Sequence, residues 1–191
     1  CCAPHVKLTG EVGIIRLIDA VKYKGGTRLT MVCGFRALKD YRMKEDNVRE
    51  ISRLLSAKPE ESALAVHRLQ DEARMWKEKL VRVQSHTMER ILDNLSGDVE
   101  NYFLFEEDVD KNVARRFVDE GKGKCHGICG IFLGNAADGY RYILGSESVD
   151  LKAFSKGFHE TLGGKGGGKS EMIQGTVTAS EEMIRSYMES V

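Results

Sequence analysis

A run of glycines near the end of the sequence constrains the fold of this chain more than any other stretch. Residues 163–170 read Gly-Gly-Lys-Gly-Gly-Gly-Lys-Ser, so five of the first six positions carry no side chain. Glycine adds nothing to a hydrophobic core and loses the most conformational freedom on folding. Its bare N–H groups can approach an anion closely, and the lysines can neutralise phosphate charge. We therefore predict a loop that binds phosphate or a nucleic-acid backbone through Gly163, Gly164, Lys165, Gly166, Gly167, Gly168 and Lys169.

The same run matches the P-loop pattern G-x-x-x-x-G-K-[ST] from Gly163 to Ser170. A P-loop needs a buried strand before it, whereas the apolar residues of segment 151–162 recur with helical spacing. This departure argues against a nucleoside triphosphatase. A flexible surface loop without a ligand stays open as the second interpretation of the run.

The overall composition narrows the class of protein. The 191 residues carry no formal net charge, so nucleic-acid binding would have to come from a local patch. The five cysteines are an odd number with no secretory signal before them, which suits a reducing cytosol better than a disulfide framework. No apolar run has the length that crosses a membrane. We expect a cytoplasmic protein with no membrane partner, and the start at Cys1 leads us to expect a piece of a longer chain.

Hydrophobic patterning divides the chain into three parts and predicts a mixed α/β fold. Residues 1–41 alternate like β-structure, with strands expected at 12–18 and 28–33. Residues 42–95 are charged and helical, and Pro59 breaks the helical pattern once. Residues 96–191 predict a compact βαββαβα domain. Its strands are expected at 101–105, 127–133, 140–144 and 172–178, and its helices at 110–119, 151–162 and 180–190.

The helix that follows Pro59 carries a heptad-like apolar seam. The seam consists of Val66, Leu69, Ala73, Trp76, Leu80, Val83 and Thr87. An antiparallel hairpin with the preceding helix would place Trp76 in a core, and an intermolecular coiled coil is the alternative. Either arrangement makes residues 42–95 a spacer arm. Acidic residues alternate with basic ones on the charged faces of this arm, which argues against a phosphate-binding track.

The glycine run and the residues after it also resemble a known family. The segment 163–175, Gly-Gly-Lys-Gly-Gly-Gly-Lys-Ser-Glu-Met-Ile-Gln-Gly, resembles the terminal motif of the DHH-associated domain. This domain ends alanyl-tRNA synthetases, freestanding alanyl-tRNA editing proteins and DHH-family phosphoesterases. Ser170 replaces a common proline and Ile173 a common small residue, but no glycine is lost. The resemblance implies that residues 96–191 bind the outer corner of tRNA, with Lys165 and Lys169 at phosphates.

The first residues of the chain contain two zinc-type ligands, Cys1 and His5, at C-x-x-x-H spacing. Together with segment 26–38 they resemble the closing half of an alanyl-tRNA editing domain. In that family such a pair joins two histidines of an H-x-x-x-H helix to hold zinc, which helps to hydrolyse the ester between a wrong amino acid and tRNA. The glycines and threonine usual between the two ligands are replaced here by residues 2–4. No histidine of this chain has another four positions on, so we expect zinc only in the intact parent and no catalysis by this chain alone.

Two further clusters have weaker support. Cys125 and Cys129 would lie about 13 Å apart on a strand, too far to share a metal ion, so buried small side chains are predicted there. Lys122, Lys124, Lys165 and Lys169 form a candidate basic patch, because two glycine-flanked segments could converge.

These resemblances, in this order along the chain, favour the C-terminal part of an alanyl-tRNA editing hydrolase. Segment 25–34 is more similar to freestanding editing proteins than to the synthetase. The chain would supply tRNA binding, and a homodimer could form through the arm or the last domain. The alternatives are the C-terminal part of an alanyl-tRNA synthetase and a dimerisation scaffold with secondary RNA binding. Half of a DHH phosphoesterase is disfavoured, because no Asp-His-His motif is present.

Overall fold

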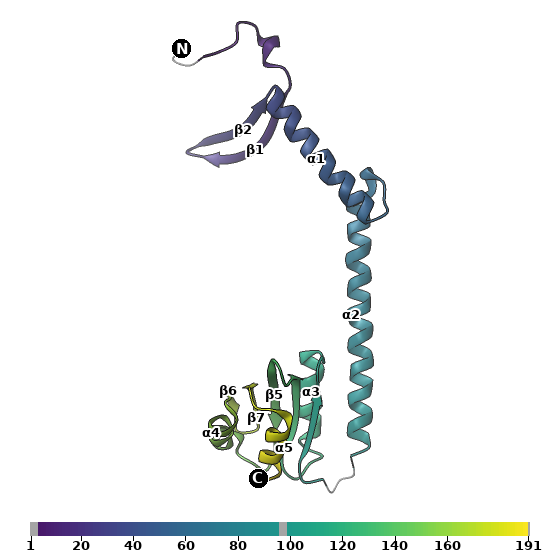
Figure 1. Cartoon of the computed structure of the whole chain (residues 1–191), viewed down its shortest axis with the longest axis vertical. Helices are drawn as coiled ribbons and strands as arrows, with labels where there is room; N and C mark the ends of the chain where they lie inside the picture. Colours follow the sequence, from purple (N-terminus) through teal and green to yellow (C-terminus); the bar gives the residue numbers. More distant parts are fainter. Residues whose placement is uncertain (1–3, 96–98, 191) are drawn as a thin grey trace. The chain divides into compact units, whose positions relative to one another are not determined.

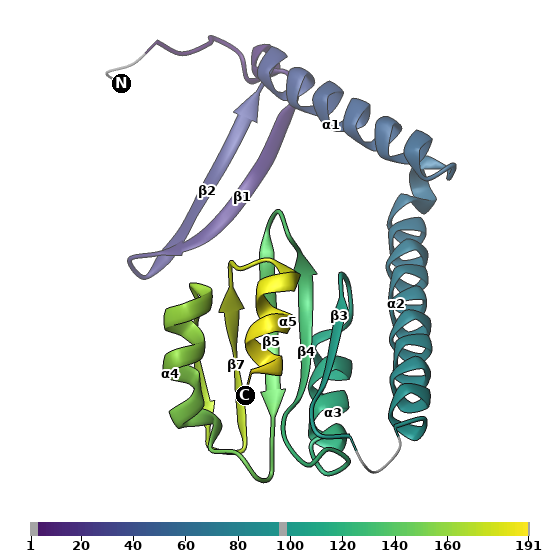
Figure 2. The ribbon, with the colours of Figure 1, turned by 60° about the horizontal axis from the view of Figure 1, so that its bottom comes forward.

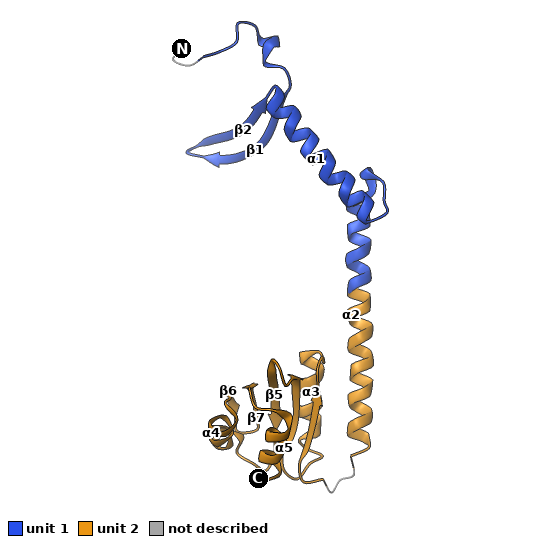
Figure 3. Cartoon of the chain, viewed as in Figure 1, with its two compact units in different colours: residues 1–73 blue, residues 74–191 orange. Residues whose placement is uncertain are grey.

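The computed structural model describes residues 4–95 and 99–190 of the chain (Figure 1). The chain forms two compact units, 1–73 and 74–191, which meet within one long helix (Figure 3). The fold is mixed α/β, as predicted, and each unit contains a sheet. None of the described helices has the length and apolar composition needed to cross a membrane. The predicted boundaries at 41 and 95 stay predictions.

The first unit is built on a β-hairpin followed by a helix. Its elements are η1 (Thr9–Val12), β1 (Ile15–Tyr23), β2 (Gly26–Cys33), α1 (Phe35–Leu54), η2 (Pro59–Glu61) and the start of α2 (Ser62–Asp93). β1 and β2 pair antiparallel across a two-residue turn at Lys24 and Gly25, whose φ angles are 44° and 79°. Positive φ at both positions gives the turn a backbone twist that matches the right-handed twist of the two strands, as is usual for two-residue hairpin turns. The two strands predicted for this part of the chain are found, and they pair as a hairpin.

Polar contacts hold this hairpin on α1. Nε of Arg16 lies 2.9 Å from a carboxylate oxygen of Asp40, and Lys44 reaches the same oxygen at 3.0 Å. Among the described residues of the first unit, only Ala37 and Ser52 are buried. Isolated two-stranded ribbons are marginally stable in water. The Arg16–Asp40 ion pair therefore positions a hairpin that has almost no hydrophobic core of its own.

Both helices of the predicted arm are present, but the apolar seam is not covered. α1 ends at Leu54, and α2 begins at Ser62 after Pro59 has opened η2. The exposed fractions on the seam are 55% for Leu69, 57% for Trp76, 54% for Leu80 and 63% for Val83. The predicted burial of Trp76 against the preceding helix is therefore wrong.

A different stripe of α2 provides its packing. Met88 and Leu92 are only 5% and 2% exposed, and they join a core cluster with α3 (Lys111–Gly121) and β4 (Cys129–Asn135). Heptad spacing identified an apolar stripe correctly but could not tell which stripe of the helix the domain covers. α2 is fixed through Met88 and Leu92, and the seam stays exposed.

The second unit contains a five-stranded sheet with helices on both faces (Figure 2). Its remaining elements are β3 (Tyr102–Glu106), β5 (Gly139–Gly145), α4 (Leu151–Leu162), β6 (Lys165–Lys169), β7 (Met172–Val177) and α5 (Glu181–Glu189). The strand order is β3-β4-β5-β7-β6, with β3 and β4 parallel and the other neighbours antiparallel. The predicted order of elements is found, with β6 as an additional strand.

Different helices cover the two faces of this sheet. α4 and α5 pack on one face, around Tyr142 and Phe158. α3 and the last turns of α2 pack on the other. Side chains fix where three of the helices begin, because Asp110, Asp150 and Ser180 each accept a hydrogen bond from a backbone N–H of the first turn.

The glycine run forms an edge strand, not the predicted loop. β6 pairs antiparallel with β7 across a turn at residues 170–171. Gly163 ends α4 in the left-handed region, at φ 64°, where glycine is the usual residue. The Gly164 N–H then donates to the His159 carbonyl oxygen at 2.9 Å. Because a helix precedes the run, as its spacing predicted, the P-loop interpretation is excluded.

Close packing explains most of the glycines in β6 and β7. A Cβ at Gly166 would lie 2.5 Å from the Tyr142 hydroxyl, and one at Gly175 would lie 2.8 Å from the same atom. A Cβ at Gly168 would overlap a backbone carbonyl of β7. The premise that these glycines have no part in packing was therefore wrong. Gly167 is the exception on β6, because a Cβ there would meet nothing within 4 Å.

Tyr142 reaches β6 from inside the core. Its exposed fraction is 1%, and its hydroxyl oxygen lies 2.5 Å from Nε2 of His159 on α4. Burial raises the pKa of Tyr142 to about 12. The hydroxyl thus keeps its proton well above neutral pH. It also lies close to Gly175 of β7 and Gly166 of β6, where a side chain would meet it.

We predict that Gly166→Ala lowers the free energy of unfolding by about 1–3 kcal/mol, the usual cost of forcing atoms into a packed site. The added Cβ has to displace the Tyr142 hydroxyl, 2.5 Å away. Urea unfolding followed by circular dichroism measures the change. Gly123→Ala is the matched control, because this exposed glycine has no atom nearer than 3.5 Å to its added Cβ. Equal unfolding midpoints for the two variants would contradict the prediction.

Tyr142 also predicts a pH dependence of stability. An unfolded tyrosine ionises near pH 10, whereas the folded pKa is about 12, so the protonated phenol favours the folded state. This contribution is complete below pH 10 and is lost as the pH rises towards 12. We expect the stability difference between the unsubstituted chain and Tyr142→Phe to be larger at pH 8 than at pH 11, measured by urea unfolding at both values. An equal difference would refute the assignment.

Candidate nucleic-acid interface

Strand β6 places two lysines on one face of the sheet edge. All five of its residues are exposed. Side chains alternate between the faces of a sheet along a strand, so Lys165, Gly167 and Lys169 share a face. Gly166 faces Tyr142 and the core under α4 and α5. The lysines therefore lie on the opposite face, the one that α3 partly covers.

Neither lysine of β6 is neutralised by an acidic side chain. Within residues 4–95 and 99–190, no ion pair joins the ammonium group of Lys165 or Lys169 to a carboxylate. As an edge strand, β6 also presents unpaired backbone N–H groups. The strand can therefore offer both positive charge and hydrogen-bond donors to a polyanion.

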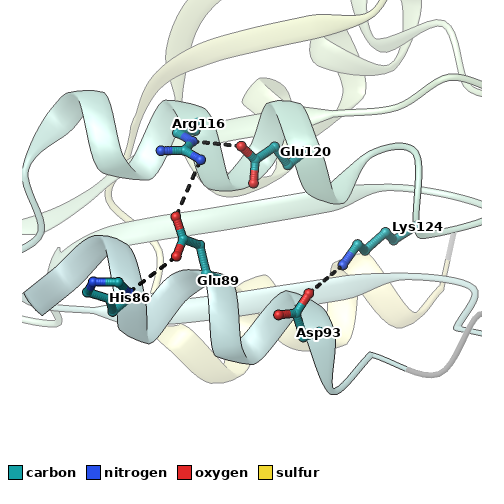
Figure 4. Close-up of polar contacts among 6 residues, drawn as sticks. All are labelled: His86, Glu89, Asp93, Arg116, Glu120 and Lys124. Carbon is teal, nitrogen blue, oxygen red and sulfur yellow. Dashed lines mark hydrogen bonds and ion pairs between the residues drawn. The ribbon is translucent and has the colours of Figure 1, made fainter. Parts of the chain in front are cut away.

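The predicted patch of four lysines is present only in part. Lys122 lies 2.9 Å from Asp119 and 3.9 Å from Glu171, and its hydrogen bond to Asp119 raises the pKa of Lys122. Lys124 lies 3.3 Å from Asp93 at the end of α2 (Figure 4). Lys122 and Lys124 thus form ion pairs with carboxylates of the domain. Of the four predicted lysines, only the two on β6 have no carboxylate partner among the described residues.

An ion pair joins α2 to α3. Arg116 of α3 lies 3.3 Å from Glu89 of α2 and 2.6 Å from Glu120 of its own helix (Figure 4). Glu89 also lies 3.4 Å from Nδ1 of His86. Two acidic residues near the end of α2, Glu89 and Asp93, thus form ion pairs with Arg116 of α3 and with Lys124.

Two grooves open on the face that carries the β6 lysines. Arg141 of β5 and Gln174 of β7 line one groove of about 240 Å3, with the acidic residues 107–108 at its side. Gln174, Lys169 and Arg115 line a second groove of about 320 Å3. Gln174 is common to both, so the grooves adjoin on the surface of β7.

Arg141 and Gln174, which line these grooves, were not predicted from the sequence as candidate contact residues. Arg141 stands between two tyrosines that are buried in the core, and it is itself exposed. Alternation of this kind indicates a strand with one covered and one open face. The sequence therefore indicated that Arg141 is exposed. It did not indicate that Arg141 lies on the same face as the β6 lysines, because that depends on which helix covers which strand.

The two cysteines near β4 contact each other, contrary to their predicted separation. β4 begins only at Cys129, so Cys125 does not lie on that strand, and the Gly127 N–H between them donates to the Glu100 carbonyl oxygen at 2.6 Å. The thiols of Cys125 and Cys129 share a hydrogen bond, and burial raises the pKa of each. The prediction of a buried small side chain is confirmed for Cys129, which is 0% exposed, whereas Cys125 is half-buried.

Of the predicted zinc ligands, Cys1 lies outside the described residues. His5 is exposed, and its Nδ1 lies 3.1 Å from the Val6 carbonyl oxygen. In the part of the chain that the structure describes, no three His, Cys, Asp or Glu side chains are placed to hold a metal ion. Zinc in proteins usually has four ligands. The pair at residues 1 and 5 does not by itself fit a zinc site, so that site stays a prediction about the intact parent.

Comparison with known proteins identifies relatives along nearly the whole chain. Residues 98–189 match the DHHA1 domain family. The alanine–tRNA ligase of Magnetococcus marinus is 30% identical over 92% of this chain and 21% of its own length. The enzyme of Nitrosospira multiformis is 26% identical over 99% of this chain and 24% of its length. That of Methanoculleus marisnigri is 27% identical over 92% and 20%.

Among solved structures, the C-Ala domain of alanyl-tRNA synthetase from Aquifex aeolicus is similar at 21% identity and a TM-score of 0.39, covering 48% of this chain and 93% of that one. The chain spans between a fifth and a quarter of the length of the curated relatives named above. Residues 98–189 are thus similar to the DHHA1 domain family, and nearly the whole chain is similar to a part of alanine–tRNA ligases.

Proposed function

We propose that this chain is the tRNA-binding C-terminal part of a protein that acts on alanyl-tRNA, and that β6 makes the contact. One observation supports this most directly. Lys165 and Lys169 are exposed on one face of a strand whose other residues lack side chains, and neither has a carboxylate partner among the described residues. The relatives are ligases that join alanine to tRNA, and we therefore propose tRNA as the polyanion that β6 binds.

The geometry of β6 suits contact with a sugar–phosphate backbone. Two side chains four residues apart on a strand are separated by roughly 13 Å, so Lys165 and Lys169 would meet different phosphates. The glycines between them allow the backbone N–H groups to approach the RNA. Contacts of this type position an RNA without reading its sequence. Identity of the tRNA would therefore be recognised elsewhere in the whole protein.

The reaction of the whole protein has two candidates. The Cys1–His5 pair resembles the closing ligands of an editing domain, which favours a zinc-assisted hydrolase that deacylates mischarged tRNA, our first choice. The relatives are ligases, which favours an alanyl-tRNA synthetase as the parent. In both cases this chain supplies tRNA binding in the cytoplasm.

A homodimer scaffold is the second candidate for the chain itself. Leu69, Trp76, Leu80 and Val83 are each more than half exposed along α2. An apolar seam of this kind on a long helix is the pattern that pairs in coiled coils. Under this hypothesis RNA binding is secondary to self-association.

We predict that Lys165→Ala/Lys169→Ala weakens tRNA binding and lowers the slope of log K against log salt by about 1 for each lysine. The reason is that each phosphate contact releases counterions, which makes affinity depend on salt. Filter binding or anisotropy over a range of salt concentrations measures the slope. Lys152→Ala/Lys156→Ala is the matched control, because it removes the same charge from exposed positions on α4.

An unchanged salt slope for the β6 variant would contradict the assignment of these lysines. Light scattering on the same samples separates the two candidate functions of the chain. A tight dimer with no measurable affinity for tRNA would replace RNA binding with the scaffold.

The incomplete metal site generates a further prediction. We expect no hydrolysis of seryl-tRNA by this chain, with or without added zinc, because Cys1 and His5 are two donors where the family uses four. Release of labelled serine over time measures the reaction. Zinc-dependent release above that of a Cys1→Ala/His5→Ala control would overturn the view that catalysis needs the rest of the parent.

A further inference from the structure

Helix α3 covers only part of its side of the second unit's sheet. It contacts β4 and β5, whereas α4 contacts β6 and β7 on the opposite face. Six exposed residues of β5, β6 and β7 lie on the side that α3 leaves uncovered, and we name them the open sheet face. They are Arg141, Lys165, Gly167, Lys169, Gln174 and Thr176.

The strand register brings these residues into rows across the sheet. Arg141 pairs with Thr176, and Thr176 pairs with Lys165, so the three side chains lie side by side on adjacent strands. Gln174 pairs with Gly167 in a parallel row. Neighbouring strands are about 4.8 Å apart, so roughly 10 Å separates the backbones at Arg141 and Lys165. Positive charge thus extends from the sheet edge inward to β5.

The open sheet face carries three cations without carboxylate partners among the described residues, and the acidic residues 107 and 108 border it beside Arg141. Arg141, Lys165 and Lys169 have no carboxylate partner, and the side chains of Gln174 and Thr176 no hydrogen-bond partner, anywhere in residues 4–95 and 99–190. The acidic groups of residues 119 and 171, which lie near Lys169, are drawn to Lys122. Three cations with amide and hydroxyl groups between them are complementary to a ribose–phosphate chain.

Gly167 marks the centre of this face, and the fold does not explain it. A Cβ there would meet nothing within 4 Å, and its φ lies outside the left-handed region. Glycine in a strand interior weakens the strand, and a larger residue would fit the pleated surface better. A side chain at 167 would, however, project between Lys165, Lys169 and Gln174.

We propose that the backbone of bound tRNA crosses β6 over Gly167, on the open sheet face, and that Arg141 and Gln174 are contact residues in addition to the lysines. The alternative path runs along the outer edge of β6 and never reaches β5. This inference rests on the proposed function, since it assigns a path to the same RNA. It adds two contact residues that lie on strands other than β6.

The test compares variants of the full chain in binding to an unmodified tRNA transcript. Arg141→Thr removes the charge and keeps a residue that suits a strand. It should lower the affinity about 5- to 20-fold and the salt slope by about 1. Gly167→Val should lower the affinity at least 10-fold while the unfolding midpoint in urea stays the same or rises. Gly167→Ala, with a smaller obstruction, should have an intermediate effect.

Lys156→Ala is the control, because it removes one charge from α4 on the opposite face of the sheet. Its affinity should match that of the unsubstituted chain. Unchanged affinity in both Arg141→Thr and Gly167→Val, with a loss in the double lysine variant, would overturn the path over the face and leave RNA binding at the edge. No tRNA binding by any form of the chain would overturn the proposed function as well.

Discussion

The contact between the Tyr142 hydroxyl and the last two strands determines how the edge of this domain is built. The hydroxyl lies against His159 and fills the space that side chains at 166 and 175 would need. Both strands must therefore carry glycine at these positions if they are to pair beside α4. The close pairing of β6 with β7 and an aromatic side chain in the core together set the composition of a surface strand. The flat, unobstructed edge that results is available to a ligand.

Much of the fold was predictable because its signals are local. Periodicity identified α1, α2, α3 and α4, and β-type alternation identified the two strands of the first hairpin. Strand β6 was not predictable, because glycine has a low preference for strands and the pairing with β7 imposes the conformation. Trp76 and the Cys125–Cys129 contact were misjudged for a similar reason. Each depends on which other segment packs nearby, and spacing along one chain does not contain that information.

Some residues of the candidate site were predictable from local sequence, and others depend on how the strands pair. Lys165 and Lys169 could be found from their glycine neighbours alone, since charge on a bare backbone is visible in the sequence. Arg141 and Gln174 join them only through strand register and the limited reach of α3. The zinc ligands were suggested by resemblance, and the described residues do not complete them. Charged residues can be read directly from the sequence, whereas the residues that share a face of the sheet are determined by strand order and register.

The lysines at the two ends of β6 have a second consequence. An edge strand with unpaired backbone groups is a template on which another chain can add a strand, and glycines make this template unusually accessible. Charged ends discourage such stacking between molecules, so Lys165 and Lys169 also act as gatekeepers against aggregation. Under the proposed RNA contact, ligand binding and colloidal solubility both depend on these two ammonium groups, so a substitution that changes one property also changes the other.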